Sequence, residues 1–109
     1  MIDIEEQRTL LELAAKAADY KFYGNGKLFW IWKDSNVEWV DWNPLLDDGD
    51  SRRLQVALEL ELRVFNGRAH AGKQDQFWCT ETWFPDGDAN AATRLAIVRA
   101  AAEIGRNMK

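Results

Sequence analysis

Residues 27–33 constrain the fold more than any other stretch of the chain. Their sequence is KLFWIWK, and its five consecutive apolar residues stand between the turn-forming residues 24–26 and 34–36. A short, bounded run of aromatic and β-branched residues is typical of a strand that is covered on both faces. The run therefore predicts a sheet with further layers of structure packed against it.

Both ends of the chain carry a helical pattern. Residues 3–20 and 90–107 repeat alanine and aliphatic side chains at the spacing of one helix face. Asp3 is the expected N-cap of the first helix, with Glu6 three residues later, as in a capping box. We expect both segments to be helices that cover the sheet.

A third helix is expected in the middle of the chain. Residues 54–64 fit two periods, because every even-numbered residue is apolar while a helical stripe is also present. Asp50 is an expected N-cap, which favours a helix over 51–60 followed by a strand over 61–66. Further strands are expected at 20–23, 37–42 and 76–84, and residues 68–72 are a weak strand or a loop.

These elements predict an α+β fold in one domain of residues 1–109. The expected order is α-β-β-α-β-β-α, with three helices packed on one mainly antiparallel sheet of four or five strands, an α/β/α sandwich. A chain of 109 residues is long enough to bury one core without disulfides.

Cysteine and terminal composition indicate the compartment. Cys79 is the single cysteine, so the chain forms no internal disulfide, which fits a reducing environment. Residues 1–6 lack a basic or apolar signal segment, and no apolar run has the roughly 20 residues of a membrane helix. We expect a cytoplasmic protein that is not bound to a membrane.

The net charge of −4 is unevenly distributed. Residues 34–50 contain six acidic residues, and residues 75–88 contain four, without a lysine or arginine in either stretch. Nucleic-acid phosphates are bound mainly by lysine and arginine, so the charge argues against direct nucleic-acid binding. It favours a protein partner with a basic surface.

The candidate site lies in the first acidic stretch. Six tryptophans in 109 residues are an unusually high number, and two of them stand beside these carboxylates. Aromatic anchors with a charged rim are typical of protein-interaction surfaces. Packing tryptophans and helix-capping aspartates are the alternative interpretation. The candidate binding residues are Trp39, Asp41, Trp42, Asn43, Asp47, Asp48 and Asp50, with Asp86 and Asp88 from the second acidic stretch.

Catalytic chemistry has little support in the sequence. His70 is the only histidine, without a neighbouring nucleophile and acid, and Cys79 stands in a strand among aromatic residues. The carboxylates of residues 41–50 lack the order of a calcium-binding loop. We expect no catalytic residue, cofactor or metal. A small metal-dependent enzyme that uses the 41–50 carboxylates is the alternative.

Two motifs carry a resemblance to a known family. Residues 42–54 read WNPLLDDGDSRRL, and residues 92–105 read ATRLAIVRAAAEIG. Together they resemble the signature of the phage ABA-sandwich domain family, and the likeness covers most of the chain. The resemblance implies a small phage or prophage protein with a sheet between helical layers. It carries over no catalytic residues, because the family has no established activity.

The expected function is that of a non-enzymatic phage or prophage accessory protein in the host cytoplasm. It would act through protein–protein contacts of an acidic, tryptophan-containing surface with a basic host or phage protein. The most specific version is an anti-defence protein, such as an inhibitor of a CRISPR system. Neither the partner nor the oligomeric state can be derived from the sequence.

Overall fold

The computed structural model describes residues 2–26, 28–33, 37–74, 76–83 and 87–108. These residues form three helices and six strands. In chain order they are α1 (Ile4–Ala17), β1 (Phe22–Asn25), β2 (Leu28–Lys33), β3 (Glu38–Asp41), α2 (Asp48–Ala57), β4 (Glu61–Phe65), β5 (Arg68–Lys73), β6 (Phe77–Thr82) and α3 (Ala89–Arg106).

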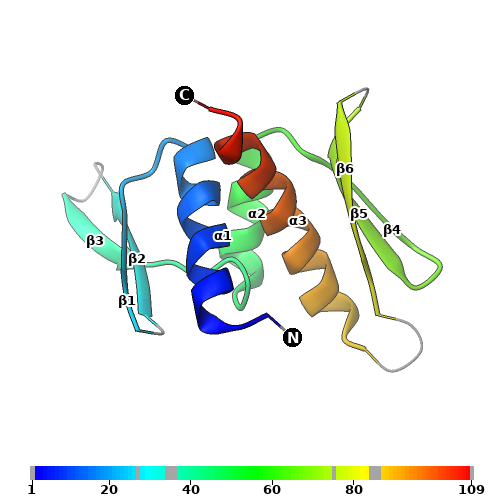
Figure 1. The fold of residues 1–109 in the computed structure, drawn as a ribbon, viewed down its shortest axis with the longest axis horizontal. Coiled ribbons are helices and arrows are strands. Elements are labelled where there is room, and N and C mark those ends of the chain that lie inside the picture. The colour runs from blue at the N-terminus through cyan, green and yellow to red at the C-terminus, as the bar shows by residue number, and fades with distance from the viewer. Residues whose placement is uncertain (1, 27, 34–36, 75, 84–86, 109) are drawn as a thin grey trace.

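The strands form two separate antiparallel sheets with the helices between them. The first sheet has the order β1-β2-β3 and the second β4-β5-β6, so each is a meander of neighbouring strands. Figure 1 shows the two sheets at opposite ends of the longest axis, with α1, α2 and α3 in the layer between. Each sheet therefore turns one face toward the helices and one face away from them.

This arrangement confirms the α+β class with three helices and corrects the rest of the predicted topology. The expectation of one sheet of four or five strands between helical layers is wrong, because two three-stranded sheets enclose the helices. The described order is α-β-β-β-α-β-β-β-α. Within each sheet, short turns connect neighbouring strands, and α2 connects the first sheet to the second.

Several element boundaries also differ from prediction. The Asp3 side chain accepts a hydrogen bond from the Glu6 N–H, which confirms the first N-cap. Asp47, and not Asp50, is the N-cap of α2, since its extended backbone lets its carboxylate accept from the Asp50 N–H. The weakly predicted segment 68–72 is the central strand of the second sheet.

Small side chains let the helices approach closely in the core. Leu11, Leu54 and Val98 are fully buried, together with most alanines of α1 and α3. Gly105 lies against α1, where a β-carbon would overlap the Leu13 carbonyl oxygen. The α1–α3 contact is therefore made almost backbone to backbone.

The β2 strand is covered on only one face, contrary to prediction. Phe29 and Ile31 point to the helices and are buried, whereas Trp30 and Trp32 are half-buried and Leu28 is exposed. The aromatic side chains of the outer face contact one another, and these contacts bury part of their surface without a further layer of structure.

Among the described residues, none of the helices combines the length and apolar character needed to cross a membrane.

Candidate functional site

The outer face of the first sheet gathers four aromatic residues. Strand register places Tyr23 opposite Trp30 and Trp32 opposite Trp39, on the face opposite to the buried Phe29 and Ile31. We call Tyr23, Trp30, Trp32 and Trp39 the aromatic face. Residues that alternate along a strand share a face, which is why three short strands bring these rings together.

The rings of the aromatic face are in mutual contact. Tyr23 and Trp30 stack with centroids 5.5 Å apart, and Tyr23 and Trp39 meet edge to face at 6.3 Å. Trp32 and Trp39 meet at 5.7 Å. Tyr23 and Trp39 nevertheless stay 53% and 47% exposed, and a shallow hollow of about 380 Å³ lies between Tyr23, Trp30 and Trp39. Contiguous exposed aromatic area of this kind marks interaction surfaces.

Trp42, the second tryptophan of the candidate site, belongs to the core. It is 4% exposed and meets Tyr20 and Phe22 edge to face, at 5.9 and 6.1 Å between centroids. The structure thus separates the two predicted tryptophans, with Trp39 on the outer surface and Trp42 beneath the sheet. The packing interpretation applies to Trp42.

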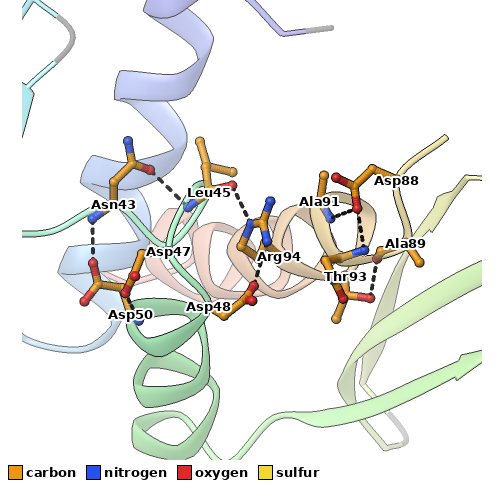
Figure 2. A network of polar contacts seen from close by, with 11 residues as sticks. Asn43, Leu45, Asp47, Asp48, Asp50, Asp88, Ala89, Ala91, Thr93 and Arg94 are labelled. Carbon is orange, nitrogen blue, oxygen red and sulfur yellow. Dashed lines mark hydrogen bonds and ion pairs between the residues drawn. The ribbon is translucent and has the colours of Figure 1, made fainter.

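Residues 43–50, which we call the acidic turn, use their polar groups to hold their own backbone. The Asn43 N–H donates to Asp50 Oδ2 at 2.9 Å, and Asn43 Oδ1 accepts from the Leu45 N–H at 3.0 Å. Asp47 Oδ2 accepts from the Asp50 N–H at 2.8 Å. Figure 2 shows these groups turned toward one another at the start of α2.

Two arginines compensate the charge of the acidic turn. Arg94 of α3 donates from Nη1 to Asp48 Oδ1 at 2.6 Å and from Nε to the Leu45 carbonyl oxygen at 2.8 Å. Arg53 donates to Asp50 Oδ1 at 2.8 Å, and this hydrogen bond raises the pKa of the Arg53 guanidinium. The predicted acidic residues 47, 48 and 50 are therefore ion-paired or used in capping.

Helix α3 connects to both acidic stretches. Asp88 is the N-cap of α3 and accepts from the N–H groups of Asn90 and Ala91. Arg94 lies six residues further along this helix, about 9 Å at the usual rise per residue, and contacts Asp48 (Figure 2). Asp86 lies outside the described residues.

Two acidic residues of β3 remain outside these ion pairs. Asp41 and Glu38 are exposed, and among the described residues neither has a cationic nitrogen within 4.0 Å. The register places Asp41 opposite Trp30, and Glu38 precedes Trp39 in the chain. Asp41 shares the parity of Trp39 and forms an acidic rim to the aromatic face, whereas Glu38 lies on the other face of β3, opposite Lys33 in the register.

The described residues offer little for metal binding or nucleophilic chemistry. Within the described ranges, no three His, Cys, Asp or Glu residues converge closely enough to hold a metal ion. Cys79 packs against the core on the inner side of β6, where burial raises the pKa of its thiol. His70 lies on the second sheet, where its Nδ1 is 2.7 Å from the Thr80 hydroxyl.

Comparison with known proteins does not extend these observations. No family model, curated protein or solved structure matches the chain. The resemblance to the phage ABA-sandwich family stays a prediction.

Sequence reasoning did not identify Tyr23, Trp30 and Trp32 as surface residues. The hydrophobicity of residues 27–33 suggested complete burial, although the largest rings all stand at even positions. That alternation, with smaller Phe29 and Ile31 at the odd positions, was the available signal for two different faces. Tyr23 belongs to the aromatic face because of the register of the β1–β2 hairpin. The glycine turn between these strands is compatible with more than one register.

Proposed function

We propose that the chain is a non-enzymatic phage or prophage accessory protein that binds another protein through the aromatic face. The observation that carries the proposal is the cluster of four contacting rings on the outer side of the first sheet, with Tyr23 and Trp39 about half exposed. Tryptophan and tyrosine dominate the energetics of protein interfaces because they bury large areas with few rotatable bonds. The phage assignment is supported by the resemblance of residues 42–54 and 92–105.

The charges next to the aromatic face support a basic partner. Asp41 places negative charge at its rim, and the chain has a net charge of −4. A complementary protein has an apolar hollow bordered by lysine or arginine. The specific form of the proposal is an anti-defence inhibitor that covers the basic surface of a host defence protein in the cytoplasm.

This proposal moves the contact surface away from the acidic turn. The carboxylates of residues 47, 48 and 50 hold α2 and α3 in place, so their contribution is to stability. Of the predicted binding residues, Trp39 and Asp41 remain in the proposed contact surface.

The test compares wild type with Trp39→Ala and with Val56→Ala, a control that truncates an exposed apolar residue of α2. Each protein is immobilised and exposed to lysate of cells that carry the gene, and retained proteins are identified by mass spectrometry. Each purified pair is then measured by calorimetry. Loss of an interface tryptophan costs about 2 kcal/mol or more, so we expect Kd to rise at least about 30-fold for Trp39→Ala alone.

The rim charge has a separate readout. Asp41→Asn is expected to slow association and to weaken its dependence on NaCl, because exposed interface charges act mainly on the association rate. The proposal is wrong if Trp39→Ala binds the purified partner as tightly as wild type. It is equally wrong if sedimentation shows that the aromatic face is buried between two copies of the chain.

A further inference from the structure

The outer face of the second sheet carries a different set of side chains. Register places Arg63 beside His70 and Phe65 beside Arg68, with Trp78 on the neighbouring strand β6. Their shared parity puts them on the side turned away from the helices. We call Arg63, Phe65, Arg68, His70 and Trp78 the basic-aromatic face.

Planar groups on this face lie in two contacting pairs. The Arg63 guanidinium carbon is 5.4 Å from the centroid of the Trp78 ring, in a cation–π arrangement. The rings of Phe65 and His70 are tilted by 35°, with centroids 5.4 Å apart. The Thr80 hydroxyl, 2.7 Å from His70 Nδ1, holds the imidazole in this position. A hollow of about 210 Å³ lies between Arg63, Phe65, His70 and Trp78.

These planar groups remain accessible, and most of them lie on a positively charged hairpin. Phe65 and Trp78 are 47% and 39% exposed, and the Arg63 side chain is 63% exposed. The β4–β5 hairpin, residues 61–73, contains three lysine or arginine residues and a single acidic residue, Glu61. Glu61 lies 3.9 Å from the Arg63 guanidinium and offsets part of that charge. The hairpin therefore has the opposite sign to the chain as a whole.

We propose that the basic-aromatic face binds single-stranded nucleic acid. An open antiparallel sheet with exposed rings is a platform on which unpaired bases can stack, while arginines contact the phosphates between them. Phe65 and His70 offer one stacking position, and the Arg63–Trp78 pair offers another. A duplex presents no free base faces to such a platform, so the specificity is for single strands.

The proposal is independent of the proposed function, since it uses the opposite end of the molecule. The expectation that the chain does not bind nucleic acid rested on the two acidic stretches, residues 34–50 and 75–88, neither of which has a lysine or arginine. Phosphate contacts depend on the local charge at the face, because exposed charges more than about 10 Å away are largely screened at 0.1 M salt. Two arginines supply few contacts, so stacking must provide most of the affinity.

The test is fluorescence anisotropy of labelled 12-nucleotide oligo(dT) and oligo(U) with the full chain in 50 mM NaCl. We expect Phe65→Ala to weaken binding by about 5- to 150-fold, the usual effect of removing one stacked ring. Val64→Ala is the matched control, because Val64 is the adjacent residue of β4, is similarly exposed at 48% and points to the other side. The Val64→Ala protein should bind the oligonucleotides with the same affinity as wild type.

Salt dependence and a second variant provide further readouts. Each phosphate neutralised on a single strand contributes a slope of about −0.7 to log K against log salt, so two arginines predict about −1.4. Arg63→Gln should halve that slope, and far-UV circular dichroism should show that each variant is folded. The proposal is overturned if wild type does not bind, if Phe65→Ala and Arg63→Gln bind normally, or if a 12-base-pair duplex binds equally well. It is also overturned if this face binds a protein in place of the oligonucleotides.

Discussion

Asp47 and Asp50 make different contacts although they stand three residues apart at the start of one helix. The Asp47 carboxylate accepts from the Asp50 N–H and closes the first turn of α2. The Asp50 carboxylate accepts from the Asn43 N–H and from Arg53, and the Asp47 carboxylate also lies 3.7 Å from the Arg53 guanidinium. Asp47 thus satisfies a donor that would otherwise be unpaired at the helix start, and Asp50 satisfies one in the preceding turn.

Replacement of Asp47 tests this division. We expect Asp47→Ala to lower the free energy of unfolding by about 1 kcal/mol, because the Asp50 N–H loses its side-chain acceptor. Asp47→Asn keeps an acceptor oxygen and should remain near the stability of wild type. Urea denaturation followed by circular dichroism measures both variants. Equal losses of stability in the two variants would indicate that the charge of Asp47, and not its capping hydrogen bond, stabilises the protein.

At the residue scale, the candidate site was predictable only in part. Trp39, a candidate binding residue, is exposed, but Trp42 was grouped with it although it is buried. The two stand three residues apart, and an odd separation in extended chain puts side chains on opposite faces. The pairing of Asp48 with Arg94 could not be predicted, because these residues are far apart in the sequence and meet only in the folded chain.

At the scale of elements, the packing of α1 on α3 depends on the absence of a side chain at Gly105. Its position leaves no space for a β-carbon next to the Leu13 carbonyl oxygen. Alanines such as Ala14 and Ala101 continue the close contact and are fully buried. Interiors packed at this density cannot absorb an added methyl group without a shift of backbone.

Two glycine-to-alanine variants test the contact between α1 and α3. Gly105→Ala should lower the free energy of unfolding by about 1–3 kcal/mol, because the added carbon forces α1 and α3 apart. Gly49→Ala in α2 is the control, since its added carbon meets mainly the movable end of Arg53. Alanine favours helix by up to about 1 kcal/mol, so the control should be as stable as wild type or more stable. A stable Gly105→Ala protein in urea denaturation would contradict the described helix packing.

The type of most elements was predictable, whereas their grouping into sheets was not. The ambiguous residues 54–64 divide, as predicted, into the end of α2 and strand β4, although α2 ends at Ala57 and its N-cap is Asp47 in place of the predicted Asp50. In contrast, β5 contains alanine, histidine and glycine, which have low strand preference, yet it is the central strand of its sheet. Its formation depends on pairing with β4 and β6, and that pairing has no local signature in the sequence.

At the scale of the whole molecule, the helical layer keeps the two outer faces apart. The protein measures 42 × 30 × 23 Å, and the two sheets lie at the ends of the longest axis (Figure 1). Residues of the aromatic face and of the basic-aromatic face therefore share no contacts. Each face should respond to substitution by itself.

A double-mutant cycle measures this independence. We expect the stability changes of Trp39→Ala and Phe65→Ala to add in the double variant within about 0.5 kcal/mol, as is usual for well-separated residues. Chemical denaturation of the four proteins gives the coupling energy. A larger coupling would show that the helical layer transmits strain from one sheet to the other.

The placement of helices between two outward-facing sheets also determines how many ligands the chain can hold at once. Molecules bound at the two ends approach from opposite directions, so neither blocks the other. With the two proposed ligands, the chain would tether a protein and a nucleic-acid strand to each other within the span of one small domain. The overall affinity would rise above that of either end only for two ligands that are themselves linked, because the second binding event is then intramolecular.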